Sequence, residues 1–292
     1  MKNLSELNYG IIGLGIMGGS IAKAIRTNIL SDKSNGKIYA MDKNLESLYA
    51  ATDSKIINKG FLPEDTKKML SICDFVFICL YPHATLDFLK NNSKNFKNDA
   101  IITDISGVKA LLEKEYDSIK PQNADFIFGH PMAGGEKEGF GASKGEYFLN
   151  HNYILIPHSN NKPENLSLLR ELITKMGFTK ITETTSDDHD NKIGFTSQLC
   201  HVVASAMVES AENTEITSFG GGSFEDLTRI AMINAPLWTE LFISNKEKLI
   251  NHIENFKNQL TIMEELISKE DKENLTELLN DVRKKRIEMQ KR

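Results

Sequence analysis

The chain has 292 residues, of which 40% are apolar and 26% charged, so it is long enough to build one large domain or two ordinary ones around a packed core. Its net charge of -5 and pI of about 5.9 give no sign of the basic surface that nucleic-acid binding requires. Three cysteines without C-x-x-C spacing exclude a disulfide scaffold and a cysteine-rich zinc site and predict a cytoplasmic protein, and no apolar run is long enough to span a membrane.

The first 42 residues follow the order strand, glycine-rich loop, helix, strand and acidic residue. The apolar run Tyr9–Leu14 predicts a buried strand, and Ile16–Arg26 predicts a helix with a face of small residues. A second strand is predicted over Lys37–Met41, and Asp42 follows it directly. The loop has G-x-G-x-x-G spacing, with its glycines at Gly13, Gly15 and Gly18.

This order of elements predicts a dinucleotide site. Glycines permit a tight turn and a close approach of the backbone to a pyrophosphate, which lies on the N-terminus of the helix. Asp42 would accept hydrogen bonds from the adenosine ribose, which favours NAD, whereas the neighbouring Lys43 leaves room for NADP. The alternative is a glycine-rich turn that only packs a helix on a sheet. The candidate cofactor-binding residues are Gly13, Gly15, Ile16, Met17, Gly18 and Asp42.

Strands and helices alternate as far as residue 185. Apolar runs predict further strands at Asp74–Leu80, Ala100–Thr103, Phe126–Phe128, Tyr153–Ile156 and Phe178–Thr182. A helix is predicted from Ser106 to about Ile119. This alternation predicts a doubly wound, mostly parallel, Rossmann-type α/β domain in residues 1–185. Ligands bind at the carboxyl ends of strands in such sheets, so we expect one crevice to be faced by Tyr81, Ser106 and His130.

The segment Phe128–Gly139 is rich in glycine. Its glycines and Pro131 argue against a regular helix or a central strand, so a loop is predicted. His130 stands where the chain leaves the apolar run, and a histidine on such a loop is a candidate acid or base near neutral pH. The alternative is a tight turn in which His130 only hydrogen-bonds a carbonyl group.

The apolar pattern becomes helical after Thr185 and the strands stop, so residues 186–292 are predicted to form an all-α domain. One helix is predicted from Asp187 to Asn213, and its stretch 195–208 is apolar or small nearly all round, so we expect it to be buried. A polar stripe runs along this helix at every fourth position, through Ser197, His201 and Ser205. The stripe either hydrogen-bonds other helices or faces a polar ligand.

A glycine-rich break at Gly220–Gly222 precedes a predicted helix over Phe224–Ile233, which bears Asp226 and Arg229 three residues apart. One interpretation is a surface ion pair, which is common and contributes little stability. The other is capture of a carboxylate, because arginine binds carboxylates in a bidentate manner. From Lys246 onward, apolar residues recur at helical spacing, which predicts core packing or a dimer contact.

Together these motifs resemble those of the prephenate dehydrogenases of tyrosine biosynthesis. The matching segments stand in the family's order, and they are Gly13–Ser20, Gly129–Gly139, His189–Asp190 with Ser197 and His201, and Gly220–Ala231. The resemblance implies a Rossmann domain followed by a helical domain that forms a homodimer. It also implies that NAD oxidatively decarboxylates prephenate to 4-hydroxyphenylpyruvate, carbon dioxide and NADH. Aromatisation of the ring drives the loss of carbon dioxide, so no metal is required.

The resemblance implies roles for individual residues. His130 resembles the catalytic histidine that hydrogen-bonds the ring hydroxyl of the substrate, and Arg229 resembles the arginine that holds a substrate carboxylate. Ser197 and His201 resemble further substrate contacts, and Glu136 resembles the acid that guards the pocket.

The resemblance departs from the family's pattern at one serine. Many members read Gly-Ser-Val-Lys where this chain has Ser106-Gly107-Val108-Lys109. The serine that assists the catalytic histidine is thus displaced by one position, and we expect Ser106 to substitute for it.

Other functions fit parts of the sequence. Arogenate dehydrogenase is the nearest, because arogenate is the amino analogue of prephenate. The β-hydroxyacid and 6-phosphogluconate dehydrogenases share the Rossmann-plus-helices plan and resemble one another in using a catalytic lysine on the helical domain, where this chain offers Lys192. A non-catalytic NAD-binding sensor would retain Gly13–Asp42 but would not need His130 with Arg229.

The sequence also bears on regulation by tyrosine. Many relatives carry a regulatory ACT domain after the helices or a chorismate mutase before the first strand, and the pattern of this chain predicts neither. We therefore expect tyrosine, if it inhibits, to compete with prephenate in the active site rather than to act through a second site.

Overall fold

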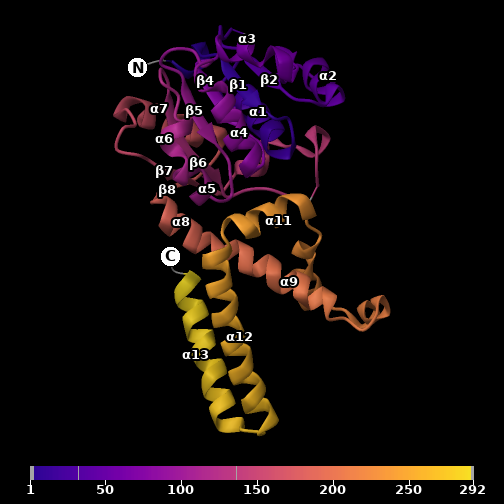
Figure 1. Cartoon of the computed structure of the whole chain (residues 1–292). Helices are drawn as coiled ribbons and strands as arrows, with labels where there is room; N and C mark the ends of the chain where they lie inside the picture. Colours follow the sequence, from indigo (N-terminus) through magenta and orange to yellow (C-terminus); the bar gives the residue numbers. More distant parts are fainter. Residues whose placement is uncertain (1–2, 32, 136, 291–292) are drawn as a thin grey trace.

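The computed structural model describes residues 3–31, 33–135 and 137–290. Within these residues eight strands form one sheet in the order β3-β2-β1-β4-β5-β6-β7-β8, in which only β6 and β7 pair in antiparallel fashion (Figure 1). The predicted doubly wound, mostly parallel sheet is confirmed. The strands are β1 (Tyr9–Ile12), β2 (Ile38–Met41), β3 (Lys59–Phe61), β4 (Phe75–Ile78), β5 (Ile101–Asp104), β6 (Asp125–Pro131), β7 (Asn152–Ile156) and β8 (Lys180–Glu183).

Helices cover both faces of the sheet, and the central strands are therefore apolar on both sides. Because successive side chains of a strand point to opposite faces, Phe75 and Phe77 of β4 enter one core and Val76 and Ile78 enter the other. The first core also takes side chains from α1 (Ile16–Asn28), α2 (Leu45–Asp53) and α7 (Pro163–Met176). The second takes side chains from α3 (Thr66–Leu70), α4 (Pro82–Asn92), α5 (Ala110–Lys114) and α6 (Tyr116–Ile119).

Strand β6 changes its partner halfway along its length. Its first residues, Asp125–Ile127, pair with β5 in parallel, whereas Phe128–Pro131 pair with β7 in antiparallel register. The prediction of a loop over Phe128–Gly139 is therefore wrong for its first residues. His130 lies inside β6, opposite Ile154 of β7. The antiparallel return of β7 holds this segment extended. His130 is thus held by its pairing with β7 and lies just beyond the end of β5.

The helices that follow the sheet are α8 (Ser186–Ile193), α9 (Leu199–Glu209), α10 (Gly222–Thr228), α11 (Ala235–Ser244), α12 (Lys246–Ser268) and α13 (Lys272–Gln290). Strand β8 ends at Glu183 and α8 begins at Ser186. The division into a domain of residues 1–185 and another of residues 186–292 stays a prediction, although its boundary lies in this short connection. Leu241 of α11 approaches Gly107 at the end of the sheet, so the helices contact the strands' carboxyl ends.

Several predicted helices differ from those in the structure. The helix expected over Asp187–Asn213 is interrupted by a π-helical turn at Gly194–Gln198, which separates α8 from α9. The helix expected from Ser106 begins only at Ala110, because the backbone N–H groups of Ser106 and Lys109 bind carboxylates outside the helix. The helix expected over Phe224–Ile233 ends in a 3₁₀ turn at Arg229–Ala231.

One strand was not predicted at all. Strand β3 lies at the edge of the sheet and has only three residues, of which Phe61 alone is buried. A strand this short has too few residues to display a period of two. Its pairing with β2 therefore depends on tertiary structure and not on a recognisable pattern.

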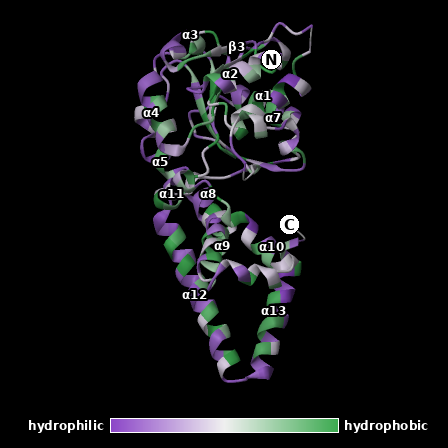
Figure 2. Ribbon diagram, turned by 90° about the vertical axis from the view of Figure 1, so that its right-hand side faces the viewer, coloured by the Kyte–Doolittle hydropathy of each residue, from purple (hydrophilic) through white to green (hydrophobic). Residues whose placement is uncertain are grey.

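Helices α12 and α13 leave most of their apolar residues exposed. Within the described residues, Leu249 is the one buried residue of α12, and α13 has none. The two helices meet at the connection between them and diverge with distance from it, as Figure 2 shows. The stretch 195–208 was expected to be buried, but Phe195 is 51% exposed and Val208 45% exposed. A single chain therefore does not cover this surface. None of the described helices is long and apolar enough to cross a membrane.

Candidate active site

The glycine-rich loop after β1 has the geometry that its spacing predicts. Gly13 has a φ of +91°, in the left-handed region that favours glycine, and a side chain there would collide with the carbonyl oxygen of Cys79. A Cβ at Gly18 would lie 1.9 Å from the carbonyl oxygen of Gly13, so the helix can pack this closely only with glycine. Gly15 is the N-cap of α1 and contributes no side chain to the cap. No described atom lies within 4 Å of its Cβ position, which leaves open space in front of the helix N-terminus.

Asp42 connects the end of β2 to this loop. Its Oδ2 accepts a hydrogen bond of 2.6 Å from the backbone N–H of Leu14, and its Oδ1 accepts one of 2.7 Å from the N–H of Asn44. The carboxylate is only partly buried. Asp42 therefore orders the glycine-rich loop while part of its surface stays accessible to a ligand.

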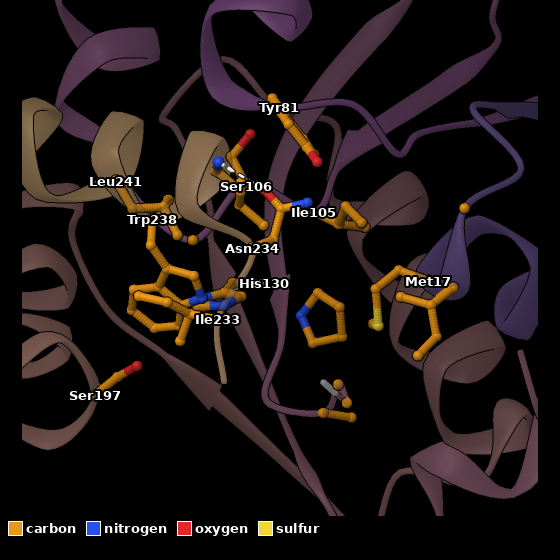
Figure 3. Close-up of a pocket in the computed structure, with 18 of the residues that line it drawn as sticks. Met17, Tyr81, Ile105, Ser106, His130, Ser197, Ile233, Asn234, Trp238 and Leu241 are labelled. Carbon is orange, nitrogen blue, oxygen red and sulfur yellow. Dashed lines mark hydrogen bonds between the residues drawn. The ribbon is translucent and has the colours of Figure 1, made fainter. Parts of the chain in front are cut away.

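A cavity of about 680 Å³ lies between the carboxyl ends of the strands and the helices α9 and α11 (Figure 3). The three residues expected to face one crevice, Tyr81, Ser106 and His130, all line it. Of the other predicted residues, those that line it are Gly15, Ile16, Met17, Gly18, Ser197 and His201. The open end of the glycine-rich loop and the candidate catalytic histidine thus share one cavity.

The remaining predicted residues do not line this cavity. Gly13 and Asp42 contact the backbone around the glycine-rich loop instead. Arg229 is exposed and does not line the cavity, although the next residue, Ile230, does. Glu136 lies outside the described residues. Of the predicted polar stripe, Ser197 and His201 line the cavity and Ser205 does not.

His130 is joined to two buried residues from the start of the helical region. Its Nδ1 lies 2.9 Å from Nε2 of His189, and Nδ1 of His189 lies 2.6 Å from Oδ1 of Asp190. His189 is 1% exposed and Asp190 is fully buried. The other ring nitrogen of His130 lies towards Gly107, whose Cβ position is 3.8 Å from Nε2. Gly107 lines the cavity, so Nε2 is the nitrogen on the ligand side.

A second buried pair supports the backbone beneath His130. Nζ of Lys109 lies 2.6 Å from Oδ2 of Asp104 and 2.6 Å from the carbonyl oxygen of Gly129, and both charged side chains are fully buried. Oδ1 of Asp104 accepts a hydrogen bond of 3.2 Å from the N–H of Gly129. This pair replaces the ladder hydrogen bonds that β6 loses when it leaves β5, and so holds the residue before His130.

The environment keeps both histidines neutral at pH 7. Burial, assisted by the neighbouring His189 and the Lys109 ammonium, lowers the pKa of His130 well below its usual value of 6.5. Burial also lowers the pKa of His189, against the opposing effect of its hydrogen bond to Asp190. A neutral imidazole beside a cavity can accept a proton from a bound hydroxyl group.

Both parts of the chain match models of one protein family. Residues 21–182 match the nucleotide-binding domain of prephenate dehydrogenase, and residues 185–281 match the dimerization domain of the same enzyme. The chain belongs to the prephenate dehydrogenase family.

Individual members of the family align over most of the chain. The prephenate dehydrogenase of Bacillus subtilis is 27% identical over 274 residues, which cover 91% of this chain and 71% of that protein. The cyclohexadienyl dehydrogenase of Zymomonas mobilis is 26% identical and covers 96% of this chain and 95% of that protein. The crystal structure of Aquifex aeolicus prephenate dehydrogenase in complex with hydroxyphenyl propionate and NAD⁺ has a TM-score of 0.87 and 33% identity, covering 99% of this chain and 100% of that one.

Ser106, the displaced serine, was expected to assist His130, but it makes no hydrogen bond to it. Ser106 is 3% exposed, and its hydroxyl has no hydrogen-bond partner among the described residues. The family's serine position corresponds to Gly107, whose Cβ would lie close to Nε2 of His130. Ser106 therefore makes no hydrogen bond to His130 in this structure, and its role in place of that serine stays a prediction. Ser106 lines the cavity, and its buried hydroxyl has a hydrogen-bonding capacity that a bound ligand can use.

On the helical side, the cavity wall is formed by an aromatic pair. The ring of His201 stacks on Trp238 with 3.6 Å between centroids, and Nδ1 of His201 donates a hydrogen bond of 2.9 Å to the carbonyl oxygen of Ser197. Figure 3 shows Trp238 on the same side of the pocket as His130, with Met17 on the opposite side.

His189, Asp190 and Trp238 were not among the predicted site residues. His189 and Asp190 entered the sequence analysis only as part of a matching segment. The sequence signal that could have identified them is the adjacent histidine and aspartate near the start of a predicted helix. Nothing in the local sequence connects them to His130, which lies 59 residues earlier.

Proposed function

We propose that this member of the family is an NAD-dependent prephenate dehydrogenase, which oxidatively decarboxylates prephenate to 4-hydroxyphenylpyruvate. The observation that carries the proposal is the ligand-facing Nε2 of His130 in the cavity that the glycine-rich loop also lines. The family assignment and the likeness to the Aquifex aeolicus structure support it. A second candidate substrate is arogenate, because a relative of similar identity is named for cyclohexadienyl substrates generally.

The glycine-rich loop fits a dinucleotide. The open space at Gly15 lies at the N-terminus of α1, where backbone N–H groups can bind a pyrophosphate. Asp42 stands at the end of β2, where an acidic residue binds the ribose of NAD. When bound, NAD accepts the hydride from the substrate carbon that bears the hydroxyl group.

The residues of the chain bind the substrate and move its proton. Nε2 of His130 accepts the proton of the ring hydroxyl as that group becomes a carbonyl. Loss of carbon dioxide returns the electron pair of the broken carbon–carbon bond to the ring, which becomes aromatic and is protonated on oxygen. The proposed substrate contacts are Ser106, Ser197, His201, Arg229 and Glu136.

The direct test of this function is the absorbance of NADH. The purified protein with NAD and prephenate is expected to produce NADH and 4-hydroxyphenylpyruvate, and parallel assays with arogenate measure the preference between the two substrates. Omission of either substrate or NAD serves as the control. Binding of NAD without turnover of either substrate would favour a sensor and overturn the proposed activity.

Asp42 is expected to select NAD over NADP. Its carboxylate would repel a 2′-phosphate, so kcat/KM should be higher with NAD than with NADP. Asp42→Ser should bring the two kcat/KM values closer together. Because Asp42 also holds the N–H of Leu14, the variant should bind NAD more weakly. Kinetics with both cofactors measure the effect, and Asp53→Ser on the exposed end of α2 is the control. Equal kcat/KM values for the two cofactors in the unmodified protein would contradict the prediction.

We further infer that the protein is a homodimer formed through its helical part. The match of residues 185–281 to a dimerization domain supports this, and so do the exposed apolar residues of α9, α12 and α13. An apolar surface of this kind on a protein in water normally has a partner. One chain has a mass of 32.8 kDa, and light scattering is expected to give twice this value. A measured mass equal to that of one chain would contradict the inference.

A further inference from the structure

We propose that His189 and Asp190 are positioning residues, which fix the proton of the His130 ring on Nδ1 and so keep Nε2 as the proton acceptor. The proposal rests on the proposed function of His130. It assigns the choice of tautomer to a chain of hydrogen bonds that runs from the helical region into the sheet.

The series of hydrogen bonds begins at the carboxylate of Asp190, whose partners are all donors. Oδ1 of Asp190 accepts a hydrogen bond of 2.8 Å from the backbone N–H of Lys109, and Oδ2 accepts one of 2.7 Å from the N–H of Ala110. Ionised carboxylates only accept hydrogen bonds. Nδ1 of His189, 2.6 Å from Oδ1, must therefore carry the proton in the bond between them.

The position of this proton determines the tautomers of His189 and His130. A neutral imidazole that donates from Nδ1 is an acceptor at Nε2. Nε2 of His189 lies 2.9 Å from Nδ1 of His130, so His130 must donate in that bond. Its proton is then on Nδ1, and Nε2 presents a lone pair towards the cavity. If His189 instead carried its proton on Nε2, it would donate to Nδ1 of His130. The proton of His130 would then be on Nε2, and Nε2 could not act as a base.

The surrounding structure holds the backbone of Asp190 in place. The backbone oxygen of Asp190 accepts a hydrogen bond of 2.8 Å from the side chain of Asn245 at the start of α12. Asn245 also donates to Oε1 of Gln198 in the π-helical turn. With both Asp190 and His189 buried, no water competes for their hydrogen bonds. Since position 107 is a glycine here, no hydroxyl group at that position orients the ring from the other side.

Nuclear magnetic resonance of the full-length protein reads the tautomer directly. The protein is labelled with ¹⁵N-histidine, and two-bond proton–nitrogen correlations at pH 7 distinguish the protonated nitrogen from the bare one in each ring. The signal that disappears in His130→Asn identifies His130. A proton on Nδ1 is expected, and a proton on Nε2 would overturn the proposal. This measurement needs no substrate, so it separates a failure of the proposal from a failure of the proposed function.

The variant Asp190→Asn tests the consequence. Its amide can donate to Nδ1 of His189, which reverses both rings and places the proton of His130 on Nε2. We expect kcat to fall by about 10³-fold or more, on the scale of tautomer inversion in other histidine-dependent enzymes, while the KM for substrate and the affinity for NAD stay nearly unchanged. Asp188→Asn, on the exposed face of the same helix, should leave kcat unaffected. An Asp190→Asn protein with normal kcat, or with His130 still protonated on Nδ1, would contradict the proposal.

Discussion

Replacing His130 by asparagine is expected to lower kcat by about 100-fold or more, the usual loss when a general base is removed. Asparagine keeps a polar group near Nδ1 of the original ring, so the hydrogen bond to His189 can be retained and the fold should persist. What the variant lacks is the lone pair at Nε2 on the ligand side. Steady-state kinetics with NAD and prephenate measure the change, and thermal unfolding checks the fold.

Two results would reassign His130 to a structural role. One is a variant with near-normal kcat, and the other is a loss of activity that a fall in thermal stability fully explains. His83→Asn is the matched control, because His83 is an exposed histidine of α4 that does not line the cavity. That control should retain normal kinetics.

The substitution Arg229→Ala is expected to raise the KM for prephenate by about 10- to 100-fold while the affinity for NAD changes little. A hydrogen bond to a charged group contributes about 1.5–3 kcal/mol, and each 1.4 kcal/mol corresponds to about a tenfold change. The larger losses typical of buried pairs are not expected, because Arg229 is exposed in this structure. It begins the turn whose next residue, Ile230, lines the cavity.

The guanidinium geometry of Arg229 gives a sharper version of this test. Arg229→Lys should recover only part of the affinity, because an ammonium group cannot bind a carboxylate in a bidentate manner. Arg170→Ala serves as the control, since Arg170 pairs with Glu183 on the surface of the sheet domain. An unchanged KM in both Arg229 variants would limit Arg229 to a structural ion pair.

The sequence by itself determined the elements whose signals are local. The strand before Gly13, the helix after it and the acid at Asp42 lie within 42 residues, and glycine geometry connects them without help from the rest of the chain. Long apolar runs such as Phe75–Ile78 predicted buried strands, because a central strand covered on both faces is apolar throughout. The candidacy of His130 also came from its local setting.

Tertiary structure alone decided the features that depend on distant partners. The change of partner along β6 requires β7, and it placed His130 in a strand where a loop was predicted. The π-helical turn at Gly194–Gln198 and the single-chain exposure of Phe195 depend on packing, which a helical period does not report. Asp190 and His130 are 60 positions apart, yet hydrogen bonds through His189 connect them, and no pattern along the chain encodes such a contact. The physical reason is that periodicity records which face of an element is buried, whereas a hydrogen-bonded site depends on which elements meet there.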